Sequence, residues 1–232
     1  MRVRKEEVDQ CAFCGADGVL TRDHIPPKGI FAKPRPDNLI TVQACTKCHS
    51  QQTSRDDEYF RNALIVREEL SQHPEVLKVQ PTVMRSLSSP HKAGMLAEFL
   101  KNIRLIERVT PGGIFIRKQL ALQTDMVRIR RVVQRILTGL FYHHKKHRLP
   151  VGYDALVFND ESLQNWRANQ LAVWQKKVIK PLLAQNAITI GNGVFSYSFG
   201  FDTSDPDTTY WILVFYERAG FLGLTVPSEQ NI

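Results

Sequence analysis

The residues best suited to chemistry begin with four cysteines, arranged as the pairs Cys11/Cys14 and Cys45/Cys48 with thirty residues between the pairs. Each pair has the C-x-x-C spacing, and four thiolates make the tetrahedral sulfur set that structural zinc prefers. This segment holds few large apolar residues, so a metal cross-link would supply stability that burial cannot. A redox dithiol is the alternative reading. Two pairs without a βαβ pattern favour structural zinc.

Between and beside the cysteine pairs lie Asp23-His24, Asn38 and His49, which directly follows Cys48. Metal-assisted phosphodiester cleavage needs an oxygen ligand that holds a divalent cation on the phosphate, and a neutral imidazole that takes a proton from water. Adjacent residues on an extended segment point to opposite faces. Asp23 and His24 could therefore do these two jobs from one strand end. Taken singly, Asn38 could be a turn residue, and His49 could bind zinc in place of a cysteine.

Taken together, these residues resemble the HNH (ββα-metal) endonuclease signature in its zinc-containing, four-cysteine branch. The resemblance covers about the first sixty residues, and its strings are Arg22-Asp23-His24-Ile25-Pro26-Pro27-Lys28-Gly29, Asp37-Asn38-Leu39, Cys45-Thr46-Lys47-Cys48-His49 and Asp56-Asp57-Glu58-Tyr59-Phe60. It implies that His24 is the general base. It also implies that Asp23 and His49 hold a catalytic divalent cation, and that Asn38 ties the loop to the second strand and so orients the base.

Two features depart from the compact HNH pattern. The spacing from Asn38 to His49 is longer, which predicts a bulge or a longer turn. Thr53 stands where a second helix ligand would fall. A site with two protein ligands suits Mg²⁺ or Mn²⁺ that keeps several waters better than tightly held Zn²⁺. Asp56 or Asp57 could add a ligand, although a role in capping the next helix is the simpler expectation.

The positive charge is concentrated in the middle of the chain. The formal net charge is +8, and residues 61–150 alone carry an excess of eleven. Arg128, Arg131 and Arg135 fall on one face of a helix predicted over residues 125–144, where they could contact phosphates or simply face solvent. The run His143–Arg148 is interpreted as a basic surface turn, because adjacent histidines on a helix do not share a face.

The pattern of elements predicts an α+β fold in three regions. Residues 1–60 would form the zinc-stapled HNH module, with strands at 18–21 and 38–42 and a helix after a capping box at Ser54. Residues 61–150 would form a basic, mainly helical region with a possible strand pair at 103–120. Residues 151–232 would form an α+β region of unknown role, rich in β-hairpins.

Composition limits the class of protein. The chain has 232 residues, of which 43% are hydrophobic and 9% aromatic, as in globular proteins. It contains no apolar run near the roughly 20 residues that span a bilayer. Residues 1–7 show no apolar core behind their charges, so no secretory signal is expected and the predicted location is cytoplasmic.

The leading hypothesis is therefore a metal-dependent endonuclease that cleaves nucleic acid, with double-stranded DNA as the expected substrate. The alternative is a zinc-knuckle nucleic-acid-binding protein that has the scaffold without catalysis. RNA is a third possibility, because neither the chemistry nor the charge discriminates the sugar. The sequence leaves the oligomeric state open.

Overall fold

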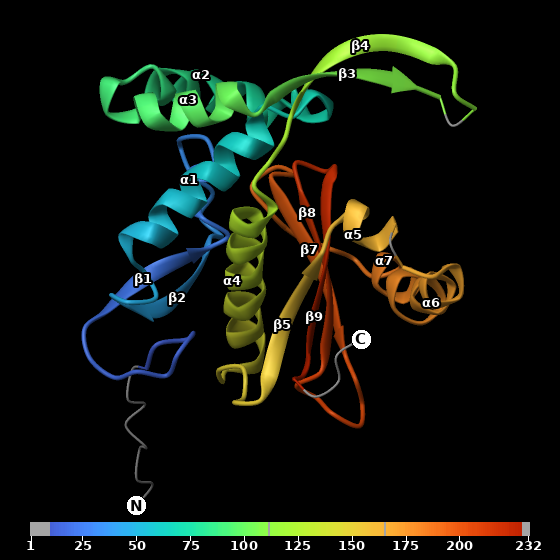
Figure 1. Ribbon diagram of the computed structural model, residues 1–232. Coiled ribbons are helices and arrows are strands. Elements are labelled where there is room, and N and C mark those ends of the chain that lie inside the picture. The colour runs from blue at the N-terminus through green and yellow to red at the C-terminus, as the bar shows by residue number, and fades with distance from the viewer. Residues whose placement is uncertain (1–9, 111, 165, 229–232) are drawn as a thin grey trace, which may run out of the picture.

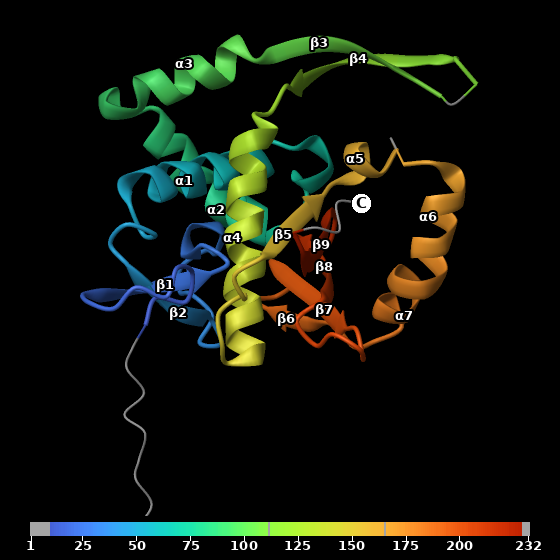
Figure 2. The same ribbon diagram turned by 60° about the horizontal axis from the view of Figure 1, so that its bottom comes forward.

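The computed structural model describes residues 10–110, 112–164 and 166–228, and within them it confirms a mixed α+β fold (Figures 1 and 2). The predicted absence of a secretory signal in residues 1–7 lies outside the described residues. Residue 111, in the loop predicted between the strands of 103–120, also lies outside them. In the part of the chain that the structure describes, no helix is long and apolar enough to cross a membrane.

The described chain begins with a β-hairpin followed by a helix. Strands β1 (Leu20–Ile25) and β2 (Ile40–Cys45) pair antiparallel, with Leu20 opposite Cys45, and helix α1 (Gln51–Ile65) comes next. A short 3₁₀ turn, η1 (Lys28–Ile30), lies in the loop between the strands. Both strands start later than predicted, so Asp23 and His24 lie inside β1. The predicted capping box at Ser54 is wrong, because Ser50 caps α1 by accepting a hydrogen bond from the Thr53 amide.

The segment after α1 is helical and then forms an extended hairpin. It contains η2 (Glu68–Leu70), α2 (Pro74–Leu87), η3 (Pro90–Lys92), α3 (Ala93–Lys101), β3 (Ile103–Val109) and β4 (Phe115–Leu122). Helix α2 was not predicted. It is capped by His73, whose ring accepts from the Glu75 amide. Strands β3 and β4 confirm the predicted strand pair, and they project away from the body of the protein (Figure 1).

Helix α4 (Met126–Lys145) confirms the predicted long amphipathic helix and stands between the N-terminal hairpin and the C-terminal sheet (Figure 1). Its apolar face is buried, including Ile129, Val133 and Ile136. A Cβ atom on Gly139 would lie 2.6 Å from Cδ1 of Ile25 in β1, so only glycine allows this approach of the helix to the strand.

The end of α4 corrects part of the interpretation of residues 143–148 as a surface turn: residues 146–148 are exposed after the helix ends, but residues 143–145 belong to α4. The helix continues to Lys145, and the His144 ring packs against Phe199 and hydrogen bonds to the Tyr197 hydroxyl at 2.9 Å. Burial lowers the pKa of His144 to about 4. His147 contacts Asp207 at 2.8 Å. This run therefore joins α4 to the sheet.

The C-terminal region is a five-stranded antiparallel sheet with a helical excursion. Its strand order is β5-β9-β8-β7-β6, and the excursion after β5 passes through short helices and one π-helical turn (Figure 2). The elements are β5 (Tyr153–Phe158), α5 (Asp160–Gln164), α6 (Ala168–Trp174), η4 (Gln175–Ile179), α7 (Lys180–Leu183), β6 (Ile188–Ile190), β7 (Phe195–Phe201), β8 (Thr209–Phe215) and β9 (Ala219–Pro227). The β-hairpins predicted for this region are confirmed by the pairing of β6 with β7 and of β8 with β9.

One cluster of buried side chains connects all three predicted regions. It includes Ile25 of β1, Phe60 of α1, Ile136 of α4 and Phe215 of β8. The boundary predicted at residue 60 falls within α1. The N-terminal hairpin is therefore packed onto the rest of the protein through α1 and α4.

Candidate functional site

The four cysteines converge into one cluster that could hold a metal ion such as zinc. Their sulfur atoms all lie within 4.8 Å of one another, and the Cys14 and Cys45 sulfurs are 3.7 Å apart. A tetrahedron with Zn–S bonds of about 2.3 Å has sulfurs about 3.8 Å apart, whereas a disulfide needs about 2.05 Å. Cys45 ends β2, and the knuckle after it leads into α1. A metal held by the cluster would therefore join the hairpin to the start of the helix.

The electrostatics of the cluster also suit a cation. Burial raises the pKa of Cys11, but hydrogen bonds from the Cys45, Cys14 and Phe13 backbone outweigh it and bring that pKa down to about 6. A backbone hydrogen bond from Cys48 lowers the pKa of Cys45. Burial and the neighbouring sulfurs raise the pKa of Cys48. The four thiols therefore cannot all ionise together unless a cation offsets their mutual repulsion.

A cleft of about 260 Å³ opens beside this cluster and holds three of the four predicted catalytic side chains. Asp23 and His24 reach it from β1, and His49 reaches it from the residue before the α1 cap. Asp57 of α1 also lines it. Among the described residues, Asp23, His49 and Asp57 do not form a close ligand group like that of the cysteines.

His24 and Asp23 occupy different environments, as alternation along a strand requires. Asp23 is buried, whereas His24 is partly exposed to the cleft. Burial lowers the pKa of His24, and the Lys28 cation lowers it further, while Asp23 opposes both. The imidazole is therefore neutral near neutral pH and able to accept a proton.

His49 is held by β1 as well as by its own knuckle. Its Nδ1 atom lies 2.9 Å from the Thr21 hydroxyl, and its amide donates to the Cys45 carbonyl at 2.9 Å. The first contact fixes the plane of the ring and leaves Nε2 available. His49 thus lies between the β1–β2 hairpin and the start of α1, and its ring is oriented by a hydrogen bond as the rings of metal-binding histidines are.

Asn38 does not take the position that the resemblance implied. Its side-chain amide donates to the Thr189 carbonyl, beside the C-terminal sheet, at 3.2 Å. Within the described residues this contact replaces the expected tie between the loop and β2. Asn38 therefore anchors the loop to the sheet and does not orient His24.

Asp56 and Asp57 are adjacent in α1 but have different surroundings. Neither caps the helix, because α1 begins at Gln51. Asp57 lines the cleft and bonds to Arg135, and burial raises its pKa while Arg135 opposes that shift. Asp56 turns to Arg128 and Arg131 instead. Asp57 is thus the acid of this pair that lies within reach of the candidate site.

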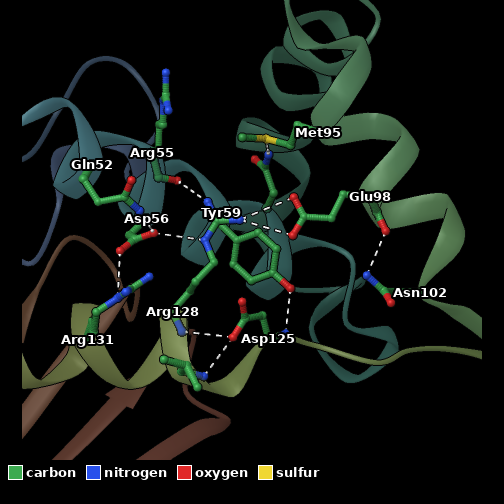
Figure 3. Close-up of polar contacts among 12 residues, drawn as sticks. Gln52, Arg55, Asp56, Tyr59, Met95, Glu98, Asn102, Asp125, Arg128 and Arg131 are labelled. Carbon is green, nitrogen blue, oxygen red and sulfur yellow. Dashed lines mark hydrogen bonds and ion pairs between the residues drawn. The ribbon is translucent and has the colours of Figure 1, made fainter.

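Arg128 is the centre of an ion-pair network between α4 and α1 (Figure 3). Its guanidinium contacts Asp56 at 3.0 Å and Glu98 at 3.3 Å, and it stacks 4.1 Å from the centre of the Tyr59 ring. Arg131 contacts the other oxygen of Asp56 at 3.1 Å. Both oxygens of this buried carboxylate are therefore paired.

Arg135 lies one helical turn after Arg131 in α4 and also pairs with acidic side chains. It bonds to Asp57, and its Nε lies 3.6 Å from Oδ2 of Asp23. This separation is too long for a hydrogen bond. Both of these atoms are buried without a hydrogen-bond partner in the described structure. Asp23 is thus charge-balanced but keeps one buried acceptor oxygen unused.

These contacts correct the prediction of a phosphate-binding arginine stripe. Arg128 and Arg135 are largely buried against carboxylates, and Arg131, although half exposed, shares Asp56. The three arginines serve as internal counterions. The sequence reasoning missed Arg22, Lys28, Arg35 and Arg61, which line the cleft itself. The feature that could have identified these four residues is their position within or close to the stretches of sequence that resemble the HNH signature.

Comparison with known protein-family models, curated proteins and solved structures gives no match to this chain. The fold and site therefore define an α+β protein with a four-cysteine cluster that could hold a metal such as zinc. Beside that cluster is a cleft lined by acids, histidines and cations.

The Arg135 pairing predicts a large difference in stability between two α4 variants. Arg135→Met leaves Asp23 and Asp57 buried without their cation and should cost about 3 kcal/mol of unfolding free energy. Arg131→Met is the matched control. Its side chain is 51% exposed and Asp56 keeps Arg128, so the cost should stay below about 1 kcal/mol. Urea unfolding measures both, and equal losses would contradict the assigned roles.

Proposed function

We propose that this protein is a metal-dependent endonuclease of the HNH type that hydrolyses phosphodiester bonds in nucleic acid, with double-stranded DNA as substrate. One observation carries the proposal. The order hairpin, cysteine knuckle, helix brings Asp23, His24 and His49 to a single cleft beside the four-cysteine cluster. These are the residues to which the HNH resemblance assigns the chemistry.

The side chains of the cleft fit a hard divalent cation. Oδ2 of Asp23 is a buried acceptor without a hydrogen-bond partner in the described structure, and His49 lines the same cleft. Asp23 and His49 would hold Mg²⁺ or Mn²⁺, with water completing the coordination, and Asp57 lies close enough to the cleft to assist. When bound, such a cation stabilises negative charge on the leaving oxygen.

His24 supplies the proton transfer in this proposal. Its neutral ring accepts a proton from a water molecule as the water oxygen attacks phosphorus, and the bond from phosphorus to the 3′ oxygen breaks. Lys28 and Arg35 lie near enough to affect the pKa of His24, and they would place a phosphate beside it.

The experiment that tests the proposal is plasmid nicking by purified protein with Mg²⁺, with Mn²⁺ and with no added divalent cation. The wild type should nick, and His24→Ala should reduce the rate by at least about a hundredfold, since it removes the base. DNA binding and thermal unfolding should be unchanged. Cleavage by His24→Ala at the wild-type rate would show that His24 is not the base, and an RNA duplex in parallel tests the choice of substrate.

A second candidate is a zinc-knuckle protein that binds nucleic acid without cleaving it. The observation in its favour is that Arg135 already balances Asp23 and Asp57, so the acids of the cleft do not require a metal. Binding of DNA without nicking under every metal would establish this candidate in place of the nuclease.

We further propose that the four-cysteine cluster binds structural zinc. The purified protein should contain about one zinc per chain, and Cys45→Ser should lose the metal and unfold the N-terminal hairpin, because binding of a structural zinc is coupled to folding. Elemental analysis with thermal unfolding measures both effects. Freshly reduced, folded wild type that contains no zinc would contradict this assignment.

A further inference from the structure

The cleft has a rim of cations that the ion-pair network does not use. Arg22, Lys28 and Arg35 line it together with His24. Arg35 donates through Nε to the Lys28 carbonyl at 3.3 Å. Among the described residues, none of these three cations pairs with a carboxylate, and all three are exposed.

Three acids of the N-terminal region, Asp23, Asp56 and Asp57, are neutralised by cations from elsewhere in the chain. Residues 1–60 have equal numbers of acidic and basic side chains, so the sequence alone predicts no net positive charge that would attract a polyanion there. Arg135 balances Asp23 and Asp57, and Arg128 and Arg131 balance Asp56. Each of these cations belongs to α4. These three acids therefore do not offset the charges of Arg22, Lys28 and Arg35 at the cleft.

The basic surface continues from the cleft along α1. A second hollow shares His49, Ser54 and Glu58 with the cleft and adds Arg55 and Lys92. A third hollow shares Arg55 and Lys92 with the second. Figure 3 shows the Arg55 side chain pointing away from the Asp56–Arg128 network. The hollows share lining residues and so form one continuous groove, in which the Arg55 guanidinium is exposed and makes no ion pair with another described residue.

The acids that line this groove are already occupied. Glu58 pairs with Lys92 and with Arg61, and Glu98 pairs with Arg128. Asp125 accepts hydrogen bonds from the first amides of α4. A polyanion in the groove would therefore meet free cations and neutralised carboxylates.

We propose that the phosphate backbone of the nucleic acid binds along this groove, with Arg22, Lys28 and Arg55 as phosphate contacts, and that Arg128 and Arg135, buried against carboxylates, do not contact it. The inference rests on the proposed function for the identity of the polyanion. It places the scissile phosphate beside His24 and runs the flanking strand along α1. Arg128 and Arg135 thus act indirectly, by balancing the acids Asp56, Asp57 and Asp23 of the N-terminal region.

The test is the salt dependence of binding to a fluorescently labelled DNA duplex of about 20 base pairs, measured by anisotropy without divalent cations. The variant carries Arg22→Ala, Lys28→Ala and Arg55→Ala. The slope of log affinity against log salt is negative, and each lost phosphate contact makes it shallower by about one unit. The slope of the variant should therefore be shallower than that of the wild type by about three units.

The matched control carries Lys176→Ala, Lys177→Ala and Lys180→Ala. It removes three exposed cations from the helical excursion on the far side of the sheet (Figure 1). Its slope should equal that of the wild type. Zinc content and thermal unfolding of both variants establish that they are folded. An unchanged slope in the groove variant, or an equal fall in the control, overturns the proposed groove.

This result is separable from the failure of the nuclease itself. If the wild type nicks DNA and the groove variant keeps the wild-type salt slope, the proposed DNA-binding groove is wrong and the proposed endonuclease activity is supported. A wild type that binds through the groove cations and never nicks supports the groove and overturns the enzyme. A wild type that neither binds nor nicks overturns both.

Discussion

The pairing of Arg135 with Asp57 and Asp23 is the contact on which the candidate site depends. It joins three elements, β1, α1 and α4, at the base of the cleft. Each of these charges is largely buried, so none is tolerable without the others. The same guanidinium also determines what remains available for chemistry. It leaves one oxygen of Asp23 without a hydrogen bond, and it removes the acidic field that would otherwise repel a phosphate.

The cysteine cluster provides the second constraint, at the other end of the hairpin. With a metal bound, it would link the end of β2 to the segment before β1 and to the start of α1. Packing also holds this region, because Ile25, Ile30 and Phe31 belong to the buried core and Ile25 lies directly against Gly139 of α4. Asp23, His24 and His49 lie between the cysteine cluster and the ion pairs of Arg135, which together would set their positions relative to one another. Such preorganisation is what a hydrolytic site requires.

Local patterns in the sequence predicted the features that are determined by residues close together in the chain. The amphipathic period revealed α4, the alternating apolar residues revealed the C-terminal hairpins, and the C-x-x-C spacing revealed the cysteine cluster. Contacts between distant residues were not predictable in this way. Arg128 and Arg135 meet Asp56 and Asp57 more than seventy residues away, so their helical stripe resembled a free basic face. The contact of Asn38 was unpredictable for the same reason, because its partner Thr189 is 151 residues further along the chain.

The central claim is that the cleft holds a catalytic divalent cation although Arg135 already balances its acids. The most direct measurement is anomalous X-ray scattering from Mn²⁺ in crystals of the His24→Ala protein bound to a DNA duplex. The account predicts a manganese peak between Asp23 and His49, separate from the metal of the four cysteines. Bound DNA with no manganese in the cleft, and with Arg135 still against Asp23, would contradict it.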